Sequence, residues 1–216
     1  MRVLVIENRD HEAEVAVQAL SDAGHRVSFC HEAGTEAFDC NGMPGQAGCP
    51  LDHGEIDVTV VARSGAMTAG GSEASAREAG IGCAQRHRVP VVIAGTLGAD
   101  NPPAWASDIV AASDPYLVER IDAAARKGRV PLIEAAEAAA RAVLDRAGLR
   151  SVPLVGRVSR DDRRLHVSVD VATDLDRRLR ETIGVRVAGA VRAIETTSPS
   201  IDVQVLTSPP TALIVK

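Results

Sequence analysis

Short apolar runs that alternate with helical patterns constrain the fold of this chain more than any other feature. The first run, VLVI at 3–6, has no polar position, which is typical of a strand buried on both faces of a sheet. Further strand patterns follow at 25–30, 56–62, 89–95 and 107–112. Helical patterns separate or follow them at 10–24, 72–88 and 115–128, and Asp10 is expected to cap the first of these helices. Strands that alternate with helices form parallel sheets, so residues 1–127 are predicted to be an α/β domain with a doubly wound sheet of five parallel strands.

The second half of the chain has a different order of patterns. An apolar stripe at helical spacing is followed by two alternating runs, a second helical pattern and a third alternating run, at 130–148, 152–158, 165–171, 174–195 and 201–206. The polar stretch SRDDRR between the two paired runs indicates a hairpin turn. Residues 130–216 are therefore predicted to be a small α+β domain whose three-stranded sheet has one open face.

Composition argues against several classes of partner. Aromatic residues make up only 2% of the chain, whereas proteins that bind single-stranded nucleic acid rely on aromatic stacking. The formal net charge of −5 argues against duplex binding, which requires a basic surface. No apolar stretch reaches the roughly 18–20 residues needed to cross a bilayer. The N-terminus shows no secretory pattern, so we expect a cytoplasmic protein that binds neither nucleic acid nor membrane.

The usual nucleotide-binding motifs are missing from the turns where this kind of sheet would carry them. The turn after the first strand reads ENRDHE, which has no glycine and contains acids that would repel phosphate. The motif G-x-x-x-x-G-K-S/T does not occur in the chain. Nucleotide binding is therefore disfavoured.

The first domain resembles the receiver domain of response regulators. The stretches RVLVIENRDHEAEVAVQALSDAGHRV, EIDVTVVA and RVPVVIAG resemble its first, third and fourth strands with their flanking segments. The similarity covers residues 1–127 and implies a flavodoxin-like sheet, a bacterial origin and a role in signal transduction. It also implies a phosphorylation site at the carboxyl ends of the strands.

The residues at the matching positions do not support that phosphorylation. In the family, two acids at the end of the first strand hold magnesium, and these positions fall on Glu7 and Asn8. The phosphate-accepting aspartate falls on Ala62, whose methyl group cannot attack phosphorus. The family's hydroxyl and lysine fall on Gly95 or Thr96 and on Ala112 or Ser113. The resemblance therefore implies a pseudo-receiver, in which Arg63 is hypothesised to take the vacated magnesium position by pairing with Glu7.

A long loop at 30–55 is the second candidate site. It replaces a helix of the receiver pattern and contains five glycines and two prolines. Its candidate metal ligands are Cys30, Cys40, Cys49 and His53. Three thiols and one imidazole suit tetrahedral zinc, although the spacing lacks a C-x2-C pair. A redox-sensitive disulfide and thiols that pack as small apolar groups are the alternatives, and Cys83 is expected to be a buried thiol elsewhere.

The second domain resembles, more faintly, the small alkaline-shock or envelope-stress α/β domains of Gram-positive bacteria. The match rests on LHVSVDVA, on the helix that ends near Ile194 and on IDVQVL, and it covers residues 130–206. The family implies assembly or scaffolding. A plain dimerisation or packing domain is the alternative.

Together these patterns favour a non-catalytic regulatory or adaptor protein. No nucleophile with a partnering base is recognisable, so no enzymatic activity and no obligatory cofactor are expected. The expected partner is another protein or a second copy of the chain, for instance in a homodimer. The alternative is a metal-binding or redox-sensing protein that uses the Cys30/Cys40/Cys49 loop, with zinc as the candidate metal.

Overall fold

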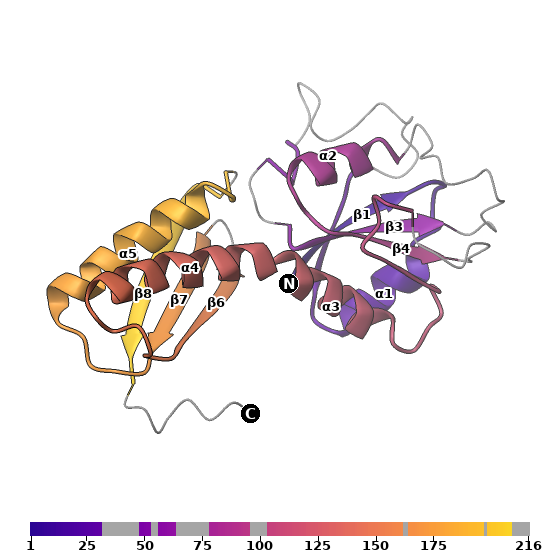
Figure 1. Ribbon diagram of the computed structural model, residues 1–216. Helices are drawn as coiled ribbons and strands as arrows, with labels where there is room; N and C mark the ends of the chain where they lie inside the picture. Colours follow the sequence, from indigo (N-terminus) through magenta and orange to yellow (C-terminus); the bar gives the residue numbers. More distant parts are fainter. Residues whose placement is uncertain are drawn as a thin grey trace. The chain divides into compact units, whose positions relative to one another are not determined.

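A computed structural model of the 216-residue chain forms two compact units, Met1–Gly128 and Arg129–Lys216 (Figure 1). Each unit contains its own sheet and its own apolar core. The structure describes residues 1–31, 48–52, 56–63, 78–95, 103–161, 164–196 and 198–208.

The first unit is built on a five-stranded sheet in the order β2-β1-β3-β4-β5. All four strand pairs are parallel. The strands are β1 (Arg2–Glu7), β2 (Arg26–Phe29), β3 (Val58–Arg63), β4 (Val91–Gly95) and β5 (Asp108–Val110). This is the strand order of flavodoxin-like folds, so the predicted fold class is confirmed.

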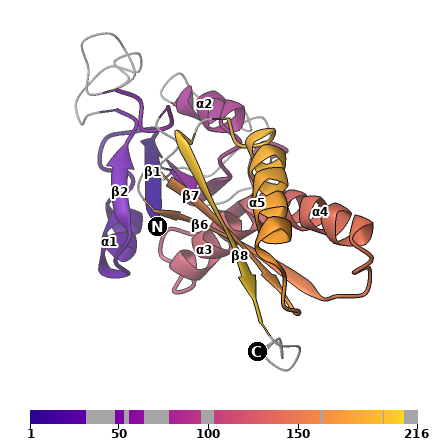
Figure 2. The same ribbon diagram turned by 90° about the vertical axis from the view of Figure 1, so that its left-hand side faces the viewer.

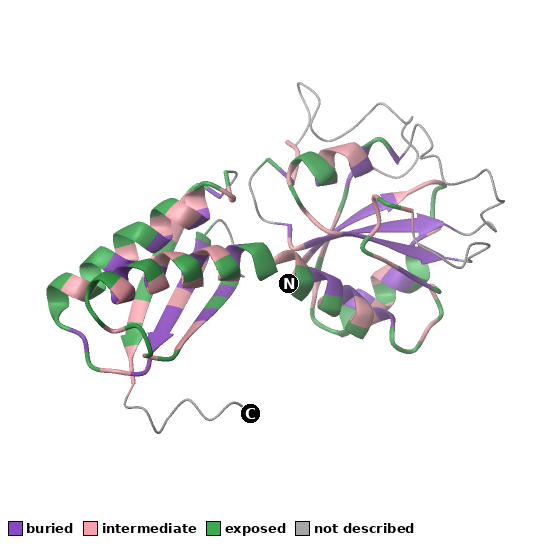
Figure 3. Cartoon of the chain, in the orientation of Figure 1, coloured by how far each residue is buried: buried purple, intermediate pink, exposed green. Residues whose placement is uncertain are grey.

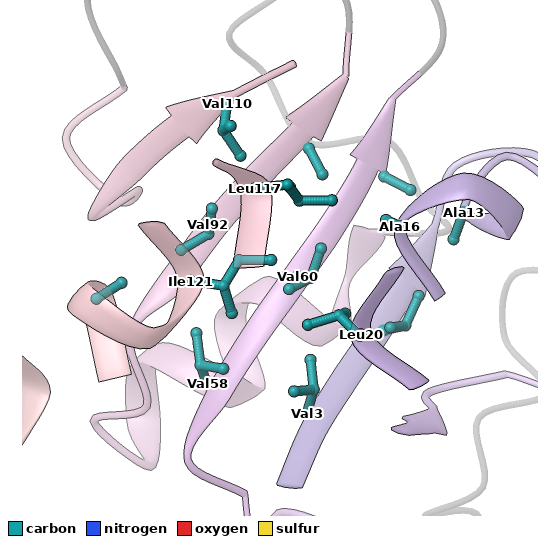
Figure 4. Close-up of a cluster of buried hydrophobic side chains, with 14 of the residues drawn as sticks. Val3, Ala13, Ala16, Leu20, Val58, Val60, Val92, Val110, Leu117 and Ile121 are labelled. Atoms are coloured by element: carbon teal, nitrogen blue, oxygen red, sulfur yellow. The ribbon is translucent and has the colours of Figure 1, made fainter. Parts of the chain in front are cut away.

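Helices cover both faces of the parallel sheet, which explains the continuous apolar runs. On one face, α1 (Glu14–Asp22) and α3 (Leu117–Gly128) enclose a cluster of small aliphatic side chains (Figure 4). On the other face, α2 (Gly80–Arg86) packs on a second cluster that includes Leu4 and Ile6. The central strands β3 and β4 are buried throughout as a result (Figure 3), because each side chain contacts one of the two helical layers, whereas the edge strand β2 is partly exposed.

The start of α1 differs from the expected cap at Asp10. The helix begins at Glu14, and the residue before it, Ala13, provides no side-chain cap. Glu7 instead supplies the acceptor, because its Oε1 lies 3.0 Å from the backbone nitrogen of Ala13. A side chain from the end of β1 thus satisfies a free N–H group at the start of the helix.

The second unit contains the predicted α+β arrangement with a three-stranded sheet. Its elements are α4 (Val130–Arg146), β6 (Leu154–Asp161), β7 (Arg164–Val171), α5 (Arg177–Arg192) and β8 (Ser200–Thr207). The strand order is β6-β7-β8, with β6 antiparallel and β8 parallel to the central β7. Both helices lie on the same side of this sheet (Figure 2), where they bury the apolar side chains of β7. Within the described ranges, no helix combines the length and apolar character that a membrane crossing requires.

The stretch SRDDRR is mostly strand rather than the predicted six-residue turn. β6 continues to Asp161 and β7 starts at Arg164, with these two residues opposite each other in the register. A contact distant in sequence supports this extension. Arg160 donates hydrogen bonds to Glu195, at 2.7 Å, and to the Ser198 hydroxyl, at 3.1 Å. The predicted hairpin is confirmed, but its strands are longer and its turn is shorter than the charged stretch suggests.

Candidate functional site

The carboxyl ends of β1, β3 and β4 meet at one edge of the parallel sheet, where α/β proteins usually bind ligands. These strands end at Glu7, Arg63 and Gly95. The register places Glu7 opposite Ala62 and Arg63 opposite Gly95. The first domain's predicted site residues therefore gather at this edge, which we call the carboxyl edge.

The position that would carry a phosphate-accepting aspartate lies within the apolar core. Ala62 is 1% exposed and packs in the cluster under α1 and α3. Its neighbour in the register, Glu7, lies toward the same face and accepts the hydrogen bond from the start of α1. Glu7 therefore has a structural partner, and Ala62 contributes only a methyl group to the packing.

In the receiver pattern a serine or threonine would stand at Gly95, but the backbone of Arg63 leaves no space for a side chain there. A Cβ atom at Gly95 would lie 1.7 Å from the carbonyl oxygen of Arg63, well inside van der Waals contact. Neither serine nor threonine can occupy this position while β3 and β4 keep their pairing. The alternative position, Thr96, lies outside the described residues. At the lysine position, half-buried Ala112 and exposed Ser113 follow β5 and carry no amine.

Arg63 forms a buried ion pair with Glu78, which lies two residues before the start of α2. The Nε and NH2 groups of Arg63 donate to the two carboxylate oxygens of Glu78, at 2.5 and 2.8 Å. Arg63 is 7% exposed and Glu78 is 1% exposed. The ring centroid of Trp105 lies 5.5 Å from the guanidinium carbon, within the range of a cation–π contact.

This geometry differs from the hypothesis that Arg63 pairs with Glu7. Successive side chains of a strand point to opposite faces. Ala62 faces the helices α1 and α3, as does its register neighbour Glu7, so Arg63 points toward the α2 face. The partner on that face is Glu78, which the sequence analysis did not single out. An arginine directly after a buried strand was the available signal, because such a charge requires a partner.

The ion pair connects the end of β3 to the start of α2. Its two parallel hydrogen bonds fix the orientation of both side chains, as bidentate arginine–carboxylate pairs do. The chain's own charges thus occupy the α2 side of the carboxyl edge. Among the described residues, this edge presents a fixed ion pair rather than a nucleophile next to a base.

A second bidentate pair fixes α3 to the last strand of the sheet. Arg120 donates to both carboxylate oxygens of Asp108, at 2.9 and 2.5 Å. The hydrogen bonds to Asp108 raise the pKa of Arg120 above its ordinary value, although burial acts in the opposite direction. Arg120 therefore stays protonated at physiological pH and can keep both hydrogen bonds to Asp108.

The cysteines are only partly described. Cys30 is buried at the end of β2, and its Sγ lies 2.8 Å from the point that a Cβ on Gly80 would occupy. Cys49 and Cys83 are half-buried and pack on the same apolar cluster. All three are thiols rather than disulfides. Cys83 was predicted to lie apart from the loop cysteines, but α2 brings it to their cluster.

The predicted zinc ligands cannot be followed as a set. Cys40 and His53 lie outside the described residues, whereas Cys30 and Cys49 lie within them. No group of three or more potential metal ligands occurs among the residues that the structure describes. The metal site at Cys30, Cys40, Cys49 and His53 stays a prediction.

Comparisons with known proteins identify no family. No protein-family model matches the chain, and no curated protein matches it by sequence. Among solved structures, a variant of Aquifex aeolicus Era bound to GDP and AlF4⁻ aligns over 96% of this chain and 93% of that chain, with 14% identity and a TM-score of 0.30. A likeness of this size carries no argument about fold or function.

Proposed function

We propose that the protein is a non-catalytic, cytoplasmic regulatory or adaptor protein whose first unit is a receiver-like module that is not phosphorylated. One observation carries this proposal: the position of the phosphate acceptor is Ala62, buried in the core, while the adjacent Arg63 is bound by Glu78. The ion pair holds the carboxyl edge in one arrangement without a phosphoryl group. The module then acts through the surface that this arrangement presents to another protein.

The chemistry of phosphoryl transfer supports the proposal. Transfer to a carboxylate requires a nucleophilic oxygen and a cation that balances the charge of the transition state. Ala62 lacks the oxygen, and the Glu7 carboxylate accepts a hydrogen bond from α1. The closed position at Gly95 removes a further group that would contact the phosphate.

Acetyl phosphate is expected not to phosphorylate the purified chain in the presence of Mg²⁺. Intact mass spectrometry should detect no added phosphoryl group under conditions that modify a receiver with a complete acidic site. Mg²⁺ should also leave the fluorescence of Trp105 unchanged, because its neighbour Arg63 already has a carboxylate partner. A phosphoryl group on any carboxylate of the carboxyl edge would contradict the proposal.

The adaptor role is tested by co-purification after cross-linking. The full chain is compared with the double variant Arg63→Met/Glu78→Leu, in which two apolar side chains replace the buried pair. A specific protein that is recovered with the intact chain and lost with a folded double variant would be a partner of the carboxyl edge. Failure to recover any protein with either chain would count against an adaptor role.

A second candidate, a metal-binding or redox-sensing role, is favoured by the three cysteines in one cluster. Cys30, Cys49 and Cys83 all pack against the same apolar side chains on the α2 face. These three thiols do not by themselves form a metal-binding group. A disulfide among them, or a metal that Cys30 and Cys49 bind together with the other predicted loop ligands, would act directly on the packing of α2. Under this candidate, anaerobically purified protein should contain about one zinc or iron per chain and show protected thiols. Four titratable thiols without metal, unchanged by mild oxidant, would rule it out.

A further inference from the structure

Strand β8 forms one edge of the three-stranded sheet and is long and regular. In the part of the chain that the structure describes, β8 pairs only with β7. Its sequence, SIDVQVLT, contains one charged residue, Asp202, and neither lysine nor proline. Natural proteins usually protect such edges with charges, prolines or bulges. Apart from Asp202, whose carboxylate lies 3.7 Å from the His166 ring of β7, β8 shows none of these devices.

The opposite edge of the same sheet is protected. On β6, the backbone nitrogen of Gly156 donates to Oε1 of Glu137 from α4, at 2.8 Å. A Cβ at Gly156 would lie 2.9 Å from Cγ of Glu137, so the helix side chain lies directly against the strand. Among the described residues, no comparable side chain bonds the outer edge of β8. A helix side chain thus bonds the outer backbone of β6, whereas the outer backbone of β8 can pair with a further strand.

The backbone pattern shows which groups of β8 point outward. The nitrogen of Ser208 donates to the carbonyl oxygen of Val171 on β7, at 3.0 Å. Because hydrogen-bonding direction alternates along a strand, the even-numbered residues of β8 bond to β7. The outward groups therefore belong to Ile201, Val203 and Val205. The side chains of these three residues pack on the helix face and remain half-buried, whereas those of β7 at the same level are fully buried.

We propose that a second copy of this chain covers the edge, with β8 pairing antiparallel to β8 across a two-fold axis at Val203. This register places Ile201 opposite Val205 of the second copy, so that the apolar stripe of one sheet continues into the other. On the open face, Asp202 lies opposite Gln204 of the second copy, and the two acidic side chains do not oppose each other. The stripe and the single charge are self-complementary, which an isologous interface requires.

In this register, antiparallel pairing of the two β8 strands forms defined backbone hydrogen bonds. Residues 201, 203 and 205 would exchange backbone hydrogen bonds with residues 205, 203 and 201 of the second copy. It also shields the half-buried side chains of the stripe from water. The inference concerns the second unit and is independent of the phosphorylation state of the first.

Charge substitutions at Gln204 test both the interface and its register. The full chain is expected to be dimeric in sedimentation velocity over a concentration series. Gln204→Lys places an ammonium opposite Asp202 and should tighten the dimer, whereas Gln204→Glu places two carboxylates together and should weaken it. Each change should be roughly three- to tenfold in the dissociation constant, because two such pairs form per dimer. Both shifts should shrink at high salt.

Two further variants control the experiment. Ser159→Lys and Ser159→Glu introduce the same charges on the exposed face of β6, at the opposite edge, and should leave the dissociation constant unchanged. Val203→Pro removes an outward N–H without breaking the ladder to β7, so it should give a monomer with an unchanged far-UV spectrum. A monomeric wild-type chain would overturn the proposal. So would a dimer that Val203→Pro leaves intact, or one that both Gln204 variants shift in the same direction.

Discussion

Glu78→Leu is expected to lower the free energy of unfolding of the first unit by about 3–5 kcal/mol, because it leaves Arg63 buried without its carboxylate. Both partners are almost fully enclosed, so water cannot replace the lost hydrogen bonds. Trp105 is the only tryptophan of the chain and lies over the Arg63 guanidinium. Urea unfolding followed by its fluorescence therefore reports on the region in which the pair is broken.

The double variant Arg63→Met/Glu78→Leu is the matched control for this prediction. It removes both charges and fills the space with apolar groups, a change that is often neutral or stabilising for buried pairs. We expect its unfolding midpoint to lie near that of the wild type. A single variant as stable as the wild type would show that Arg63 and Glu78 do not depend on each other.

Gly95→Ala is expected to destabilise the first unit by about 3 kcal/mol or more, which is large for the addition of one methyl group. The new Cβ would lie 1.7 Å from the Arg63 carbonyl oxygen, so the clash is with backbone rather than with a flexible side chain. β3 and β4 can relieve it only by separating at their paired ends. Thermal unfolding by circular dichroism should show the loss as a lower midpoint.

Gly82→Ala provides the control for a glycine in open space. Gly82 lies inside α2, and a Cβ there meets nothing within 4 Å. Alanine is favoured over glycine within helices, so this variant should stabilise the chain by about 0.5–1 kcal/mol. If Gly95→Ala behaved like Gly82→Ala, the close approach of β4 to β3 would be refuted.

Gly95 and Ala62 also bear on the proposed function. A conventional receiver would need a hydroxyl near Gly95 and an aspartate at Ala62. The structure leaves no room for the first and places the second in an apolar cluster. Under the proposed function, introducing phosphorylation would therefore require changes in the backbone and in the core, and a single substitution should not achieve it.

Much of the fold could be predicted because its cause is local. The middle residues of β1, β3 and β4 are nearly all apolar and face helices on both sides, so continuous apolar runs that alternate with helical patterns indicate parallel strands. In β7, alternation separates the side chains under α4 and α5 from those on the open face. The absence of a carboxylate at Ala62 is likewise a property of the sequence.

The predicted bounds of the hairpin turn and the predicted cap of α1 were wrong because contacts with other elements determine these features more strongly than the local sequence does. The charged stretch around Arg160 is typical of a turn, yet its pairing with Glu195 lets β6 continue to Asp161. The start of α1 resembles a site capped by Asp10, yet Glu7 from β1 supplies the acceptor. In both cases a carboxylate from outside the element, Glu195 or Glu7, makes the contact that the local pattern does not predict.

The sequence by itself determined the layered architecture and the absence of a carboxylate at position 62, because apolar pattern and residue identity are local properties. Only the tertiary structure decided what occupies the carboxyl edge, which is the pair of Arg63 with Glu78 rather than with Glu7. It also decided that, within the described ranges, the edge of β8 has no further partner, whereas the edge of β6 is bonded by Glu137. Both outcomes depend on side chains from other elements. The sequence shows a charged residue or a strand, but it does not show which other element will contact it in the folded protein.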